Sequence, residues 1–174
     1  MEDEIPRNGG LWPEYAHTMF LCVDSFYEGI AAGHLYCYCF PESLHFNGID
    51  HLLTILDGIT ECTGLVRSDH APRSLYPNKQ NKMIYRSECP WLSAEPQPNH
   101  RKPAYEFGAL QPKRGKLACF YLRIYAKQHA SMQGVLAQAG IKNEPVCFRS
   151  ALELMRMLRE ALKEADELEE HEYV

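Results

Sequence analysis

Two stretches of the chain repeat one order of hydrophobic and polar positions. Residues 19–59 and residues 119–162 each begin with a run rich in aromatic and β-branched side chains and end with apolar residues spaced three and four apart. Three landmarks recur in the same order with each interval differing by one residue, namely the pairs Phe20 and Phe120, Gly33 and Gly134, and Phe46 and Phe148. This pattern predicts a duplicated strand–strand–helix unit. Chance similarity between two ordinary units of this kind is the alternative.

The first unit begins with a predicted β-hairpin. Residues 20–27 are rich in side chains that favour a pleated strand. Gly29 and Gly33 bracket the predicted turn, and residues 34–40 return as a second strand. Pro41 is expected to end this strand, because proline cannot donate to a central ladder.

The second unit predicts the same hairpin with one addition. Residues 116–125 form its outgoing strand, residues 128–132 its turn region and residues 133–139 its returning strand. Residues 146–148 are apolar enough to add a short third strand.

A helix is expected after each hairpin. Asn47 is the predicted N-cap of the first helix, and Ser150 followed by Glu153 forms the capping-box pattern of the second. The predicted buried stripes consist of Ile49, Leu52, Leu53, Leu56 and Ile59 in the first helix and Ala151, Leu154, Met155, Leu158 and Leu162 in the second. Met155 and Met157 are interpreted as core fillers rather than as a binding surface. The last residues, EADELEEHEYV, are interpreted as a solvated acidic tail.

These elements predict an α+β fold. The expected antiparallel sheet is built from two tandem ββ(β)α repeats, with two amphipathic helices on one face and a pseudo-two-fold axis between the repeats. The expected parts of one domain are an N-terminal segment over residues 1–16, the first repeat over 17–64, a basic proline-rich insertion over 65–115, and the second repeat with its acidic tail over 116–170. The insertion is expected to wrap an edge or the open face of the sheet.

The insertion is basic, whereas the residues before it are strongly acidic. It holds seven of the eleven prolines, which forbid a regular helix there, and nine Lys or Arg against four Asp or Glu. The first 64 residues carry one Arg against ten acids, and the whole chain has a formal net charge of −5. Three interpretations stay open: the insertion neutralises the acidic first repeat, binds a polyanion, or offers an aromatic loop surface to a protein partner.

A polyanion or partner site in this segment would use its cations and the aromatic side chains between them, since such side chains stack on bases in single-strand binders. The candidate residues are Arg67, Arg73, Lys79, Lys82, Arg86, Arg101, Lys102, Lys113, Arg114, Tyr76 and Trp91. The polar tip of the second hairpin adds Gln128, His129 and Gln133, either as a recognition loop or as an ordinary solvent-facing turn.

The seven cysteines and eight histidines give no metal-site or disulfide pattern. The cysteine count is odd, the N-terminus MEDEIPRNGG is not a signal peptide, and no apolar run reaches the length of a membrane span. We therefore expect a cytoplasmic protein that binds no metal and no cofactor. Most of the cysteines are interpreted as small core residues.

Nucleophilic catalysis has one candidate. Cys89 in S-E-C-P-W is the least core-like cysteine, and His70 or His100 lies in the same segment. No phosphate-binding, dinucleotide-binding or nucleophile-elbow motif occurs in the chain. A non-enzymatic role is therefore expected, with a Cys-dependent enzyme as an alternative.

The second repeat resembles a group of small uncharacterised proteins of Clostridia and related Firmicutes. Those proteins share G-x-L-A-T-F, an R-Q-N-A-S-W-Q-G hairpin tip, and F-R-S-x-x-E-L before a terminal helix. The matching residues here are Gly115, Leu117, Ala118, Phe120, Gln128, Ala130, Ser131, Gln133, Gly134, Phe148, Arg149, Ser150, Glu153 and Leu154. Lys127, His129 and Met132 depart from the group's pattern. The resemblance implies the fold unit and a bacterial or bacteriophage-type source, and it implies no catalytic residue.

Size, acidic balance and the lack of catalytic motifs favour a non-enzymatic binding protein, an adaptor or inhibitor that acts on a protein partner. One form would be a mobile-element or bacteriophage-type inhibitor of a nucleic-acid enzyme, such as an anti-CRISPR protein, whose acidic surface occupies a groove meant for a phosphate backbone. A nucleic-acid-binding module that uses residues 65–115 is an alternative. The edges of the sheet also allow a homodimer.

Overall fold

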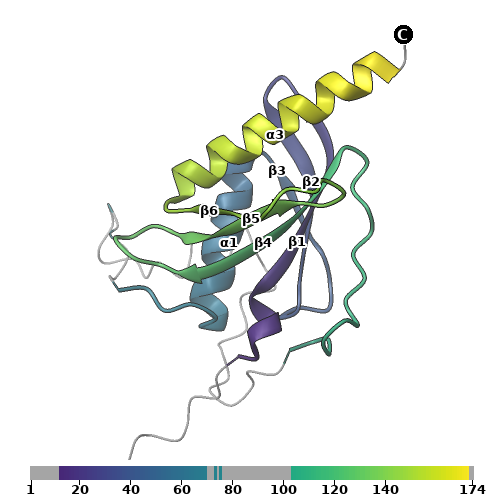
Figure 1. Ribbon diagram of the computed structural model, residues 1–174. Helices are drawn as coiled ribbons and strands as arrows, with labels where there is room; N and C mark the ends of the chain where they lie inside the picture. Colours follow the sequence, from purple (N-terminus) through teal and green to yellow (C-terminus); the bar gives the residue numbers. More distant parts are fainter. Residues whose placement is uncertain (1–11, 70–72, 74, 76–102, 173–174) are drawn as a thin grey trace, which may run out of the picture.

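Six strands pair into one antiparallel sheet within residues 12–69, 73, 75 and 103–172, which are the residues that the computed structural model describes. The strands are β1 (Thr18–Tyr27), β2 (Ile30–Cys37), β3 (Leu44–Asn47), β4 (Ala118–Ala126), β5 (Gln133–Gln138) and β6 (Val146–Phe148). The helices are α1 (Ile49–Thr63), α3 (Ala151–Glu172) and a 3-10 turn, Glu14–His17, before β1. The predicted α+β class and the antiparallel sheet are confirmed (Figure 1).

The order of the strands in the sheet is β3-β2-β1-β4-β5-β6. The two hairpins, β1 with β2 and β4 with β5, therefore meet at the central pair of β1 with β4, which is antiparallel. The predicted short strand at residues 146–148 is confirmed as β6, an edge strand. Its counterpart β3 was not predicted, because Asn47 at the end of this strand was interpreted as the cap of the following helix.

The turn of the first hairpin comes earlier than predicted, so that the returning strand β2 begins at Ile30 rather than at residue 34. Glu28 and Gly29 form it, with φ values of 50° and 80°, the left-handed backbone that a two-residue hairpin turn needs. Gly33 instead lies inside β2, where a Cβ atom would stand 2.1 Å from the carbonyl oxygen of Cys22. The glycine is required there by the close approach of the neighbouring backbone rather than by a turn. β2 also ends at Cys37, before Pro41, because the chain turns at the next two residues.

The first helix does not begin as predicted. Asn47 is the last residue of β3, and Gly48, with a φ of 96°, takes the N-cap position. The side chain of Asn47 makes no capping bond; its backbone N–H donates to Nδ1 of His51 at 3.2 Å. The prediction that Asn47 caps the helix was therefore wrong, because β3 extends through Asn47 and the helix begins after Gly48.

The predicted capping box of α3 is confirmed in its main contact. The backbone N–H of Glu153 donates to Oγ of Ser150 at 3.1 Å. The carboxylate of Glu153 accepts the backbone N–H of Arg149 at 2.6 Å, one residue earlier than the usual pattern. The helix continues to Glu172, so most of the predicted acidic tail is helical.

One buried cluster joins the sheet to both helices. Alternate strand residues face it, and Phe46, Phe120 and Phe148 are its largest fully buried side chains. The helix residues in the same cluster are Ile49, Leu52, Ile55, Leu56 and Ile59 of α1 and Leu154, Leu158 and Leu162 of α3. Met155 and Met157 pack against it partly buried, as predicted for core fillers. No helix among the described residues is long and apolar enough to cross a membrane.

The end of the predicted insertion forms a strap, residues 103–117, that lies along the sheet (Figure 1). At one end the N–H of Ala104 donates to the carbonyl of Tyr38 at 2.7 Å. At the other end the N–H of Lys116 donates to Oδ1 of Asp24 at 3.3 Å, and that of Leu117 to the carbonyl of Val23 at 3.0 Å. The strap thus spans from the residue after β2 to the middle of β1, where β4 begins, without forming a strand in its described residues.

Candidate binding surface

The strand side chains that alternate with the fully buried ones form a second face of the sheet, here called the open face, and this face carries a row of aromatic side chains. Phe20 of β1 pairs with Tyr36 of β2 on one side and with Tyr121 of β4 on the other. The rings of Phe20 and Tyr121 meet edge to face, with centroids 5.5 Å apart. Tyr121 is 48% exposed, whereas Phe20 and Tyr36 are half-buried. These three residues form the aromatic row.

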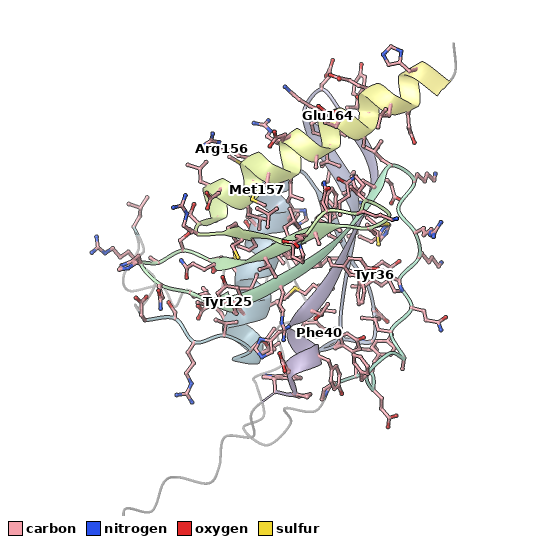
Figure 2. The ribbon with its side chains drawn as sticks, viewed as in Figure 1. Tyr36, Phe40, Tyr125, Arg156, Met157 and Glu164 are labelled. Carbon is pink, nitrogen blue, oxygen red and sulfur yellow. The ribbon has the colours of Figure 1, made fainter. Side chains whose placement is uncertain are left out.

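A second feature of the open face runs along β4. Tyr121, Arg123 and Tyr125 lie at alternate positions of this strand and form the Tyr–Arg–Tyr line. Tyr125 stands at an irregularity of the pairing with β5, between Ile124 and Ala126, and its side chain is 53% exposed (Figure 2). Nη2 of Arg123 lies 3.0 Å from the carboxylate of Glu14. The ion pair ties the arginine of this line to the 3-10 turn before β1.

The next row across the sheet is made of His45, His34, Cys22 and Cys119, each paired with its neighbour. Nδ1 of His34 lies 3.2 Å from Oδ2 of Asp24, the carboxylate that also accepts the strap N–H of Lys116. Asp24 is therefore occupied in anchoring the strap.

Two cavities, both partly open to solvent, lie between the strap and the open face. The larger, of about 280 Å³, lies between Lys113 and Arg114 of the strap and the rings of Phe20 and Tyr121. Its remaining lining residues are Cys22, Pro112, Cys119, Phe120, Ala139 and Gly140. The smaller, of about 230 Å³, lies between Tyr36 and the strap residues Tyr105 and Leu110. The aromatic row is therefore half-covered, and its exposed end is on β4.

The predicted basic residues are only partly brought together. Lys113 and Arg114 are exposed and adjoin the open face. Arg67 lies at the opposite end of β4 from these two residues. Its neighbour Ser68 forms an isolated β-bridge with Lys127, the residue that follows β4. Arg73 is exposed. The other predicted residues of this segment lie outside the described residues, and they are Lys79, Lys82, Arg86, Arg101, Lys102, Tyr76, Trp91 and Cys89.

The polar hairpin tip is held by its own side chains. Oε1 of Gln133 accepts the backbone N–H of Gln128 at 2.8 Å, and Nε2 donates to the carbonyls of Gln128 at 3.0 Å and Arg149 at 3.2 Å. Oγ of Ser131 accepts the N–H of Ala151 at 3.0 Å, at the first turn of α3. The Gln133 amide thus shapes the tip and ties it to α3, while the side chains of Gln128 and His129 are exposed.

Sequence reasoning missed a buried cation beside this tip. Lys127 is 5% exposed, and its Nζ lies 2.6 Å from Oδ1 of Asp57 and 2.5 Å from Oε1 of Glu61, both on α1. Burial by itself lowers the pKa of Lys127, but the two carboxylates outweigh it and raise the pKa above its usual range. The contact fixes the hairpin to α1. The sequence around Lys127 does not indicate a partner on α1, because Glu61 lies 66 residues earlier in the chain.

The cysteines are less uniform than predicted. Cys22 and Cys37 are buried as expected for core residues, but Cys39 and Cys119 are half-buried and Cys147 is exposed on β6. Within the described ranges, no group of three or more His, Cys, Asp or Glu side chains is placed to hold a metal ion. Comparison of the chain with known protein families, curated proteins and solved structures finds no match.

Proposed function

We propose that this protein is a non-enzymatic binding protein, an adaptor or inhibitor, whose open face receives a protein partner. The observation that carries the proposal is the Tyr–Arg–Tyr line on β4, which exposes about half of Tyr121 and of Tyr125 on either side of Arg123. Tyrosine and arginine are enriched among the side chains that dominate protein–protein binding energy. A rigid strand holds them in place, which lowers the entropic cost of binding.

A protein partner is favoured over a nucleic acid by the charges. The chain has a net charge of −5, which opposes the approach of a polyanion. Arg123 is already paired with Glu14, and Arg67 lies far along β4 from Lys113 and Arg114. These four cations therefore do not form the continuous track that a phosphate backbone follows.

The partner surface that fits the open face is apolar in its centre and carries carboxylates at its rim. The exposed rings offer apolar area with a polar hydroxyl at the end. Lys113, Arg114 and Lys116 are exposed along the strap beside these rings, and they would meet acidic groups of the partner.

Inhibition of a nucleic-acid enzyme stays a prediction, and α3 is the element that would serve it. The helix extends beyond the sheet (Figure 1). Its last fully buried residue is Leu162, and Ala165 still packs partly buried against the cluster. Residues 163–172 then carry six acids against one lysine. An acidic helix that stands clear of the core matches a basic groove built for nucleic acid. An anti-CRISPR protein would be one example of such an inhibitor.

We also propose that the sheet arose by duplication of one ββ(β)α unit, with both helices on the same side. The strand order is symmetric about the pair of β1 with β4. Gly33 and Gly134 pair with Val23 and Ile124, and each of these pairs precedes an irregularity in its hairpin. In this alignment the counterpart of Phe20 is Tyr121 rather than Phe120. The resemblance to small Firmicutes proteins and the cytoplasmic location stay predictions.

The test is affinity capture of the tagged protein from nuclease-treated bacterial lysate, followed by mass spectrometry. The wild-type chain is compared with the double variant Tyr121→Ser, Tyr125→Ser and with Leu152→Ser, a control for an exposed apolar residue on α3. We expect one dominant protein with the wild type and the control, reduced at least about tenfold with the double variant. Equal recovery with all three proteins would refute the proposed surface. If a parallel capture from untreated lysate recovers nucleic acid alone, the alternative of a nucleic-acid-binding module is favoured.

A further inference from the structure

Two cysteines face each other across the centre of the sheet. Cys22 of β1 is the direct pairing partner of Cys119 of β4. The carbonyl of Cys119 accepts the N–H of Ala139 at 2.8 Å, on the β5 side, and the carbonyl of Cys22 lies beside Gly33 of β2. The backbone N–H and C=O groups of a strand residue point toward the same neighbouring strand. Those of Cys22 therefore point toward β2 and those of Cys119 toward β5, so the two cysteines make no backbone hydrogen bond to each other.

Cys22 and Cys119 thus form a non-hydrogen-bonded pair of an antiparallel ladder. In such pairs the Cα atoms lie about 4.5 Å apart and the side chains approach more closely than in hydrogen-bonded pairs. A disulfide accepts Cα separations of about 4.4–6.8 Å. The two strands therefore hold the thiols at a spacing that a disulfide can bridge without a change of register.

The surroundings of the pair admit a small molecule. Both cysteines line the cavity of about 280 Å³ under the strap, together with Lys113 and Arg114. The backbone N–H of Gly115 donates to Sγ of Cys119 at 3.1 Å. A cavity of this size with two cations at its rim suits a small anionic ligand better than a neutral one.

We propose that Cys22 and Cys119 are a redox-active pair that reacts with a small anionic disulfide of the glutathione type. The Cys119 thiol loses its proton to solvent, and its thiolate attacks one sulfur of that disulfide and expels the first small thiolate. Cys22 then loses its proton, attacks Sγ of Cys119 in the mixed disulfide and expels the second thiolate. The two released protons and two thiolates make two small thiols, so the reagent is reduced as the protein pair is oxidised.

The order of these two steps follows from the surroundings of the thiols. Burial and the neighbouring Cys119 thiol raise the pKa of Cys22 to about 12, so that Cys22 stays a neutral thiol near pH 7. Cys119 is half-buried, and Cys22 is 3% exposed. Cys119 therefore meets the reagent first, and Cys22 resolves the mixed disulfide from close range. The product would tie β1 to β4 beside the aromatic row, independently of any partner.

The test exposes the native protein to glutathione disulfide near pH 8, quenches with an alkylating reagent, and maps the peptides by mass spectrometry without reduction. We expect a Cys22–Cys119 linked peptide that dithiothreitol removes. In Cys22→Ser we expect Cys119 to retain one glutathione. Free Cys22 and Cys119 after prolonged exposure of the wild type, or a stable glutathione adduct on Cys119 without linkage, would overturn the proposal.

A second measurement tests the role of the strap cations and needs no cysteine variant. The rate of Cys22–Cys119 linkage is compared for glutathione disulfide and for neutral hydroxyethyl disulfide, in the wild type and in Lys113→Gln, Arg114→Gln. We expect the charge variant to slow linkage by glutathione disulfide severalfold and to leave linkage by the neutral reagent unchanged. Equal slowing with both reagents, or no slowing with either, would contradict the assignment of an anionic reagent.

Discussion

Phe20 lies directly opposite Tyr121 in the central strand pair, and their rings meet edge to face at a centroid distance of 5.5 Å. Under the proposed duplication these two residues are counterparts, so that they lie on the axis that relates the two halves. The same side chains also link the covered and the exposed parts of the open face, because Phe20 lies under the strap and Tyr121 extends beyond it.

This ring contact should be measurable as a coupling energy. In a double-mutant cycle of Phe20→Leu and Tyr121→Leu, we expect the two changes to be non-additive by about 1 kcal/mol in the free energy of unfolding. Urea denaturation of the four proteins gives the value. Additivity within the experimental error would show that the edge-to-face contact does not stabilise the central strand pair.

The two strand glycines should be intolerant of alanine to a similar degree. A Cβ atom at Gly33 would lie 2.1 Å from the Cys22 carbonyl oxygen, and one at Gly134 would lie 2.0 Å from that of Arg123. We expect each alanine variant to lose about 3 kcal/mol of unfolding free energy, because backbone must shift in a paired strand. Gly140→Ala is the control: it has a φ of 81° but no atom within 4 Å of the added Cβ, and about 1 kcal/mol is expected. Chemical denaturation of the three variants decides between these values.

The buried lysine should contribute to stability far more than an exposed one. Lys127→Met leaves Asp57 and Glu61 beside each other without their cation. We expect a loss of about 2 kcal/mol in the free energy of unfolding, since both carboxylates remain partly solvated. Lys142→Met, at an exposed position, should change it by less than about 0.5 kcal/mol. Equal effects of the two substitutions would show that the Lys127 contacts are not stabilising.

Acid should weaken the fold partly through His17. Burial lowers the pKa of His17 below 6.5, and the nearby Arg123 adds to this, while the backbone carbonyl of Ile124 and the carboxylate of Glu14 oppose it. Because the folded state resists protonation of this ring, the stabilisation is fully present above pH 6.5 and is lost as the pH falls through the lowered value. We expect His17→Asn to lose less unfolding free energy between pH 7.5 and pH 5 than the wild type does. A steeper loss in the variant would contradict this assignment.

Hydrophobic periodicity was enough to predict the hairpins, the helices and the fold class, because each depends on neighbouring positions. It misplaced the first turn, since Gly33 carries the same local signal as a turn glycine while its role depends on Cys22 in another strand. Phe20 and Phe120, which the sequence pattern set against each other, lie on opposite faces of the sheet, so that under the proposed duplication this alignment would be off by one residue. The pairing of Cys22 with Cys119 joins residues almost a hundred positions apart, and neither local sequence indicates it. The same is true of the strap that covers both cysteines.

The proposed binding surface is tested most directly by site-specific photo-crosslinking. A photoreactive phenylalanine analogue replaces Tyr125 in one protein and Leu152 of α3 in another, and both are irradiated in nuclease-treated bacterial lysate. We predict a discrete protein adduct from position 125 that competition with unlabelled wild-type protein removes, and no such adduct from position 152. An adduct from position 152 alone, or none from position 125, would contradict the claim that the open face receives a protein partner.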